Sequence, residues 1–360
     1  MIEKADILSM TKPELVEFFG TLGEPKFRAE QVFSWLSKGA SFDEMTNISK
    51  ALREKLRENC LDTLPRVERK LVSAIDGTVK YLFKLYDGAC IESVLMRYKH
   101  GNTLCISSQV GCRMGCKFCA STIGGKARDL LPSELLGQVI AAEKDSGERI
   151  SNIVMMGIGE PLDNYGNVIK FLKLVNAEGG LNIGYRHISL STCGVVPGIL
   201  ALAEEELPLT LSISLHAAND EKRSEIMPVN KKWNIEALLS ACVAYYKRCG
   251  RRISFEYTLI SGKNDSVADA AELGKLLKHA FRGTGAPIHV NLIRVNEVKE
   301  TGFKRGDKET VKAFSDKLAE LGIVATLRRR LGADVDAACG QLRRSAMKER
   351  SETQETEEEN

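Results

Sequence analysis

Three cysteines in one short segment carry the clearest chemistry in this 360-residue sequence. Cys112, Cys116 and Cys119 are separated by three and by two residues, and they follow a predicted strand at 104–110. Three thiolates from one loop can hold three corners of an iron–sulfur cubane, whereas such clusters usually take four cysteines. One iron would then stay open to a small molecule that chelates it. The alternative is a structural zinc site, which normally needs four protein ligands and could take Cys105 as the fourth.

A glycine-rich turn follows the next predicted strand. That strand covers residues 152–156, and Gly157, Gly159, Glu160 and Pro161 come directly after it. On its own this run indicates no more than a turn leaving a strand. Its position one strand–helix unit after the cysteine loop makes it a strong signal, because chemistry in such folds lies at the carboxyl ends of the strands.

Together the two segments resemble those of the radical S-adenosylmethionine (SAM) enzymes. The resemblance implies that Cys112, Cys116 and Cys119 bind a [4Fe–4S] cluster, with the amino and carboxylate groups of SAM on the fourth iron. One electron from the cluster would cleave SAM to methionine and a 5′-deoxyadenosyl radical. Gly159 and Glu160 match the motif that binds the SAM amino group in these enzymes.

Further segments narrow the resemblance to the RlmN/Cfr family of radical SAM RNA methyltransferases. The match runs in order from about residue 10 to 345, and it is clearest at 104–112, 156–162, 189–197, 212–217 and 334–342. Members of this family methylate an adenosine of 23S rRNA at C2, in some tRNAs as well, or the same rRNA adenosine at C8. The overall resemblance implies C2 methylation, and C8 methylation is the nearest alternative. A zinc-stabilised RNA-binding protein without radical chemistry is the third.

The expected chemistry needs a carrier thiol. Adenine C2 lies between two ring nitrogens and is a poor nucleophile, so the methyl group must first be placed on the protein, and a thiolate is a good nucleophile toward SAM. The resemblance implies that Cys339 is this carrier and that a second SAM supplies the radical that activates its methyl group. Cys105 would help remove the C2 proton and form a transient disulfide with Cys339. Glu92 matches the proton acceptor of the family.

Other positions match SAM contacts of the family. They are Ser191, Ser214, Leu215, His216 and Asn296. The sequence departs from the family pattern just before the last of them, where Arg294 replaces the usual proline. Losing a proline removes a fixed φ and restores a backbone N–H donor.

The predicted strands and helices that position these residues indicate an α/β fold. Short β-branched runs alternate with amphipathic helical stretches after residue 103, which is typical of parallel strand–helix units. With the resemblance, this predicts a partial (β/α)6 radical SAM barrel, an N-terminal helical module, a β-meander and a short C-terminal extension. The expected boundaries are 1–62 for the helical module, 63–100 for the meander, 101–331 for the barrel, 332–346 for the extension with Cys339, and 347–360 for a disordered acidic tail.

Composition sets the class of protein and its compartment. With 43 % hydrophobic and 28 % charged residues the chain is typical of a globular protein, which excludes collagen and bulk disorder. It has no apolar run near the roughly 18–20 residues that span a bilayer, and its first ten residues do not resemble a signal peptide. Ten cysteines without such a leader favour metal or catalytic roles in a reducing cytoplasm over structural disulfides.

The charge distribution fits a polyanionic partner. The net charge is +3, and five of the 48 acidic residues lie in the last ten positions, so the rest of the chain is more basic. The resemblance implies 23S rRNA and tRNA as substrates, RNA binding by the N-terminal module, a flavodoxin or ferredoxin as electron donor, a monomer, and no membrane association. Candidate RNA-contacting groups are Lys99/His100, Lys126/Arg128, Lys231/Lys232, Arg251/Arg252, Lys304/Arg305, Arg328–Arg330 and Arg343/Arg344.

Overall fold

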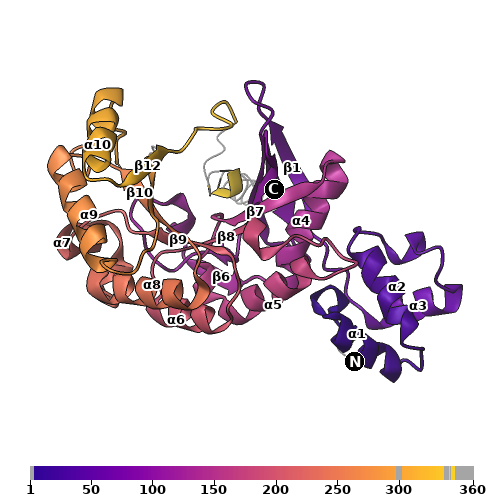
Figure 1. Cartoon of the computed structure of the whole chain (residues 1–360). Helices are drawn as coiled ribbons and strands as arrows, with labels where there is room; N and C mark the ends of the chain where they lie inside the picture. Colours follow the sequence, from indigo (N-terminus) through magenta and orange to yellow (C-terminus); the bar gives the residue numbers. More distant parts are fainter. Residues whose placement is uncertain (1–3, 297–301, 336–339, 341, 345–360) are drawn as a thin grey trace.

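The computed structural model describes residues 4–296, 302–335, 340 and 342–344 (Figure 1). Cys339 and the expected tail at 347–360 therefore lie outside the described residues. A small helical module, a curved mixed sheet and a layer of helices on the outer face of that sheet make up the described chain. No helix in the described ranges is long and apolar enough to cross a membrane.

The sheet has ten strands, with β1 and β12 at its two edges. Their spatial order is β1 (Arg66–Val72), β2 (Val79–Lys84), β3 (Cys90–Tyr98), β4 (Gly101–Cys105), β7 (Ile150–Met155), β8 (Ile188–Thr192), β9 (Thr210–Ser214), β10 (Ile253–Leu259), β11 (Ile288–Arg294) and β12 (Val324–Leu327). A separate two-stranded sheet pairs β5 (Gln109–Gly111) with β6 (Lys126–Asp129).

The helices alternate with the parallel strands. After the module helices α1 (Lys12–Thr21), α2 (Phe27–Leu36) and α3 (Lys50–Asn59) come α4 (Pro132–Ser146), α5 (Tyr165–Asn176), α6 (Val196–Glu204), α7 (Asp220–Ile226), α8 (Ile235–Cys249), α9 (Val267–Ala280) and α10 (Lys308–Glu320). Strands β4 and β7 to β12 are parallel to one another, and the sheet stays open because β12 does not return to β1. This is the expected partial barrel, extended by a seventh parallel strand.

The N-terminal helices form where their caps and apolar faces predict. The carboxylate of Glu14 accepts hydrogen bonds from the backbone N–H and the hydroxyl of Thr11, which caps the start of α1 ahead of Pro13. Leu15 and Phe19, one turn apart on α1, are fully buried. The helical module is therefore held by apolar packing that is continuous with the main core, and not by helix propensity alone.

Strands β1 to β3 form the antiparallel meander, with turns at Gly77 and Gly88, both at positive φ. The meander has two different faces. One face packs Tyr81 and Phe83 into the main core. The other, which we call the inner face, carries Lys80, Leu82, Cys90, Glu92, Val94 and Met96 and continues to Cys105 on β4.

One predicted strand is wrong in its extent. The expected strand 104–110 is split, because β4 ends at Cys105 and the chain then leaves the sheet to form β5. Gly157 causes the split: its N–H donates to the carbonyl oxygen of Ile106, and a Cβ at Gly157 would lie 2.6 Å from that oxygen. The chain after β4 therefore bends over the glycine-rich turn instead of continuing the ladder.

Candidate active site

A pocket at the carboxyl ends of the parallel strands collects most of the residues expected at the site. Its lining includes Cys112, Cys116, Cys119, Gly159, Glu160, Ser191, Ser214, His216 and Asn296. These residues come from five separate segments of the chain. Parallel strands bring such segments together because their carboxyl ends share one edge of the sheet.

The cysteine loop is fixed by backbone hydrogen bonds. The N–H of Cys112 donates to the carbonyl oxygen of Gly125 at 3.0 Å, and a Cβ at Gly111 would overlap that same oxygen. The hydroxyl of Thr122 donates to the carbonyl oxygen of Cys119 at 2.9 Å. The N–H of Lys117 donates to the end of α7. The loop therefore has one preferred path, which holds its three thiols at the pocket.

The three thiols of this loop share the pocket. All three line the pocket, and Cys112 and Cys116 are buried. Burial raises the pKa of Cys112 to about 12, so a bound cation must displace a proton there. No three His, Cys, Asp or Glu side chains among the described residues converge as ligands of one metal ion. A cubane does not require such convergence, because its three thiolates bind three different irons.

The glycine-rich turn is packed too closely for any side chain. Gly159 has φ +109°, and a Cβ there would lie 2.7 Å from the backbone nitrogen of Gln109. The side chain of Gln109 accepts a hydrogen bond from the N–H of Glu160 at 2.9 Å. The carboxylate of Glu160 accepts from the N–H of Cys193 at 2.7 Å and from that of Leu162 at 3.1 Å. Burial raises the pKa of Glu160.

His216 is held as a neutral imidazole. Its Nδ1 accepts a hydrogen bond from the N–H of Thr258 at 2.9 Å, which leaves the proton on Nε2. Burial, with a smaller contribution from Arg223, lowers the pKa of His216 to about 3. The residue has φ +58°, unusual for a side chain with a Cβ, and its ring meets the edge of Phe118 from the cysteine loop. His216 is therefore a fixed part of the pocket wall.

Two pocket-forming residues were not predicted. Arg223 is fully buried, and its guanidinium donates to the carbonyl oxygens of Cys193, Ser214 and Leu215. Glu256 lines the pocket at 3 % exposure and accepts a hydrogen bond from Asn291 at 2.6 Å. Arg223 lies in a charged run that is typical of a solvated helix, so nothing in the sequence singles it out.

Three expected residues lie away from the pocket, and a fourth lies only at its rim. The side chain of Leu215 is in the main core. Cys105 and Glu92 are buried on the inner face of the meander and its continuation. Asn296 is exposed at the pocket rim, and the backbone just before it remains regular, because the N–H of Val295 donates to Leu259 after β11 ends. The carrier candidate, Cys339, lies outside the described residues.

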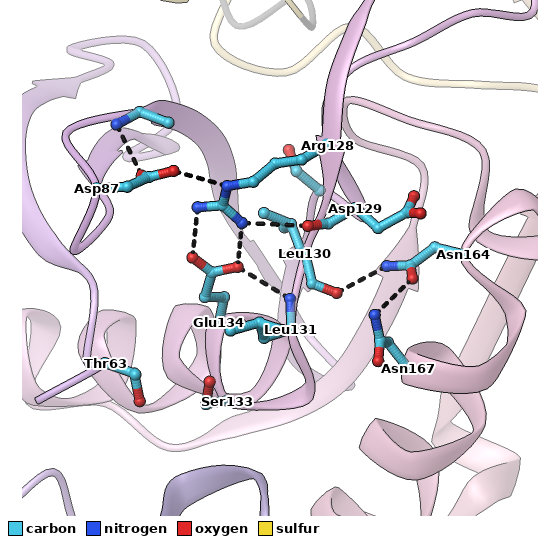
Figure 2. Close-up of polar contacts among 12 residues, drawn as sticks. Thr63, Asp87, Arg128, Asp129, Leu130, Leu131, Ser133, Glu134, Asn164 and Asn167 are labelled. Atoms are coloured by element: carbon cyan, nitrogen blue, oxygen red, sulfur yellow. Dashed lines mark hydrogen bonds and ion pairs between the residues drawn. The ribbon is translucent and has the colours of Figure 1, made fainter. Parts of the chain in front are cut away.

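One pair of the expected RNA contacts, Lys126 and Arg128, forms ion pairs within the protein. Figure 2 shows Arg128 in a fork with the buried Glu134, both bonds 2.7 Å long, and its Nε donates to Asp87 at 2.7 Å. Lys126 pairs with Asp129 and Asp163. These cations are satisfied within the protein, where they join β6 to α4 and to the meander. These ion pairs fix β6, which pairs with β5 directly before the cysteine loop.

Asn164 joins the same region to the turn after β7. Its amide donates to the carbonyl oxygen of Leu130 at 2.8 Å (Figure 2). It also donates to the carbonyl oxygen of Ser108 at 2.9 Å. Asn164 also accepts a hydrogen bond from Asn167. The glycine-rich turn and the segment after the cysteine loop are therefore one hydrogen-bonded unit.

Comparison with known proteins decides the family. Residues 5–61 match the family model for the ribosomal RNA large subunit methyltransferase N-terminal domain, and residues 106–274 match that of the radical SAM superfamily. A probable dual-specificity RNA methyltransferase RlmN of Clostridium botulinum is 55 % identical over 98 % of this chain and 99 % of its own. The chain belongs to the RlmN family of radical SAM RNA methyltransferases.

A second curated relative and a solved structure support the same assignment. The RlmN homologue of Alkaliphilus oremlandii is 54 % identical over 95 % of this chain and 98 % of its own. The crystal structure of a radical SAM methyltransferase from Sphaerobacter thermophilus is 41 % identical, with a TM-score of 0.88 over 93 % of this chain and 98 % of that one. The fold and the enzyme class expected from the sequence are confirmed. Membership of the radical SAM family implies a [4Fe–4S] cluster and SAM.

Proposed function

We propose that this RNA methyltransferase modifies C2 of an adenosine in 23S rRNA and in tRNAs, and uses two SAM molecules per turnover. The observation that carries the proposal is the single pocket that joins Cys112, Cys116 and Cys119 to the turn at Gly159 and Glu160. RNA substrates are supported by relatives that are named as dual-specificity RNA methyltransferases.

The cysteine loop would hold the cluster through Cys112, Cys116 and Cys119. When bound, the cluster supplies the electron that cleaves SAM. Glu160 would accept a hydrogen bond from the SAM amino group, since its carboxylate lines the pocket and is held there by the N–H groups of Leu162 and Cys193. Gly159 would leave room for the backbone to approach the ligand.

The remaining SAM contacts would come from the ends of the neighbouring strands. Ser191 and Ser214 offer hydroxyls to the pocket, and His216 offers an Nε2–H donor. Leu215 would contribute through its backbone, because its side chain is in the core. Asn296 would close the rim of the same site.

Three residues outside the pocket lining would carry out the methyl transfer. The sulfur of Cys339 would attack the methyl group of a first SAM, and the resulting S-methyl group would lose a hydrogen atom to the radical from a second. Its carbon would then bond to adenine C2. Cys105 would then form a disulfide with Cys339 as the bond between the Cys339 sulfur and the methylene carbon breaks, and the thiol proton would complete the methyl group. Glu92 would accept the C2 proton, and the one electron left over would return to the cluster. Support for this grouping comes from Leu331, which packs in one apolar cluster with Cys105 and Met156.

The proposal also assigns roles to the domains and names the electron donor, the oligomeric state and the compartment. The helical module, taken as 1–62, would bind RNA beside the meander at 63–100 and the barrel at 101–331, and the extension at 332–346 would carry the methyl group. Recognition would rest on RNA shape and on an adenine turned out of its stack. We propose a flavodoxin or ferredoxin as electron donor, and a monomer acting in the cytoplasm.

Nucleoside analysis tests the proposed reaction. The protein is reconstituted with iron and sulfide without oxygen, and then incubated with SAM, a reductant and either rRNA or tRNA. We expect 2-methyladenosine from both RNAs by mass spectrometry and NMR. Formation of 8-methyladenosine alone would assign the C8 reaction instead. A colourless protein with stoichiometric zinc and no iron would contradict radical chemistry.

Two cysteine variants test the proposed carrier. We expect Cys339→Ala to keep its iron and to lose all methylation. Cys105→Ala should accumulate a covalent RNA–protein adduct, because the disulfide that releases the product cannot form. Normal turnover by Cys105→Ala would exclude the proposed role of that thiol, while iron content and SAM cleavage would still report on the cluster.

A further inference from the structure

The inner face of the meander contacts the described residues of 331–344. Neither partner in this contact lies within the family models, which match 5–61 and 106–274. Glu92 on the inner face is 3 % exposed, and Lys80 beside it is fully buried. A buried carboxylate needs partners, and here those partners belong to the C-terminal chain.

Both carboxylate oxygens of Glu92 accept hydrogen bonds from backbone N–H groups. Oε2 accepts from Gly340 at 2.7 Å, and Oε1 accepts from Arg343 at 2.6 Å. The Nζ of Lys80 lies 3.3 Å from Oε2 and balances the buried negative charge. Removing the carboxylate would leave N–H groups without an acceptor in a buried place, so the contact holds the chain at two points.

Apolar side chains support the contact on both sides of Glu92. Leu342 is 7 % exposed and packs with Leu82 and Cys90 of the inner face. Leu331 packs in the apolar cluster of Cys105. The chain is therefore docked before and after the segment that holds Cys339.

Carboxylates make further anchors before that segment. Asp334 accepts from the hydroxyl of Ser73 at 2.6 Å and from the N–H of Ala74 at 2.8 Å. Asp76 accepts from the N–H of Gly332 at 2.9 Å. Ser73, Ala74 and Asp76 all lie on the turn between β1 and β2.

Gly340 also meets the cysteine loop. It has φ +84°, and a Cβ there would lie 3.0 Å from the backbone nitrogen of Ser121, two residues after Cys119. The residue that follows Cys339 in the chain is thus fixed between Glu92 and the cysteine loop. A glycine is required because the position combines positive φ with a close backbone neighbour.

We propose that Glu92, with Lys80 as its buried counter-ion, is a positioning residue that holds the chain around Cys339 on the inner face of the meander. The consequence is a high effective concentration of Cys339 at Cys105. The inference rests on the proposed function for the roles of the two thiols, and rests on the structure alone for the contact itself. In this role Glu92 binds the C-terminal chain before any proton transfer takes place.

Hydrogen exchange of the full-length, cluster-loaded protein tests the contact. In Glu92→Gln one oxygen is replaced by an NH₂ group that cannot accept, so we expect the backbone amides of 340–343 to exchange at least tenfold faster than in the wild type. Glu148→Gln is the matched control, because it carries the same change at the Arg97 ion pair of the meander and has no hydrogen bond to the described residues of 331–344. Unchanged exchange in Glu92→Gln would overturn the contact.

The thiol–disulfide equilibrium tests the consequence. The Cys105–Cys339 disulfide is equilibrated in glutathione buffers and quantified by mass spectrometry of the intact protein. We expect a tenfold lower effective concentration in Glu92→Gln, which corresponds to about 30 mV in the potential. Asp334→Ala removes an exposed anchor of the same chain and should shift the equilibrium in the same direction. This second variant keeps the proposal testable if Glu92→Gln does not fold.

The outcomes separate the two proposals. Loss of methylation with unchanged exchange and unchanged potential would leave Glu92 as a proton acceptor only and would overturn its positioning role. Absence of any Cys105–Cys339 disulfide in the wild type would contradict the proposed chemistry, and the exchange data would still decide the contact. Faster exchange with a shifted potential supports the positioning role.

Discussion

The guanidinium of Arg223 donates from Nη2 to the carbonyl oxygen of Cys193 at 2.7 Å, and so ties α7 to the turn after β8. The same side chain donates to Ser214 at 3.1 Å and to Leu215 at 3.0 Å, at the end of β9. Asn230 accepts from its Nη1 at 2.8 Å. One buried cation thus holds two neighbouring strand ends at the pocket, which matters because small displacements at such a site weaken ligand binding.

Arg223→Met should destabilise the protein by roughly 3–5 kcal/mol, because several buried carbonyl oxygens lose their donor at once. We expect Arg223→Lys to keep more stability but to bind SAM at least tenfold more weakly, since one ammonium cannot reach all the carbonyls. Denaturant unfolding and calorimetric SAM titration measure the two effects. Arg248→Met, at an exposed ion pair, should change stability by less than about 1 kcal/mol.

Gly159→Ala should abolish SAM binding while the rest of the chain folds. The added Cβ would lie 2.7 Å from the Gln109 backbone, at a φ of +109° that alanine rarely adopts. Gly166→Ala is the control, because a Cβ there meets nothing within 4 Å inside α5. That control should gain up to about 1 kcal/mol of stability. Equal SAM affinity in the two variants would show that the turn does not hold the ligand.

Lys80→Met should cost roughly 3–5 kcal/mol in unfolding free energy, because it leaves the buried Glu92 carboxylate without its counter-ion. The double variant Lys80→Met, Glu92→Leu should recover part of that loss, since no buried charge remains. Urea unfolding of the single and double variants measures both values. A double variant less stable than Lys80→Met would mean that the hydrogen bonds of Glu92 outweigh the ion pair.

The carboxyl group of Asp76 should have a pKa far below that of an ordinary aspartate. Partial burial raises its pKa, but the hydrogen bonds from the N–H groups of Gly332 and Thr78 outweigh this and lower the pKa to about 2. Because the folded pKa is depressed, its stabilising contribution is complete above the usual value near 3.8 and is lost as the pH falls through 2. Carboxyl-carbon NMR, with Asp76→Asn for assignment, measures the midpoint. A midpoint at or above 3.8 would exclude the anchor to Gly332.

The sequence was sufficient for the fold class and for the segments around the pocket. Regular alternation of β-branched runs and amphipathic stretches predicts parallel strands with helices on the outside, and Asp76-Gly77 predicts the turn between β1 and β2. The spacing of Cys112, Cys116 and Cys119 is local, so a chain segment can show it without its neighbours. The same holds for the turn at Gly159.

Long-range pairing could not be predicted in this way. Arg128 looks like a surface cation, and only the approach of α4 and the meander gives it Glu134 and Asp87 as partners. The split of the strand after Cys105 depends on the close approach of Gly157 to a backbone 51 positions away. No local sequence pattern predicts either feature, because each depends on which distant segment of the chain packs beside it.

The sequence by itself determined the resemblance to radical SAM enzymes, since a three-thiol loop and a glycine-rich turn are properties of single segments. Only the tertiary structure decided how Glu92 is used, because its partners are the backbone of Gly340 and Arg343, 248 and 251 positions later in the chain. Hydrogen bonds over such separations form when folding has paid the entropy of bringing the segments together. No sequence pattern along the chain predicts these hydrogen bonds.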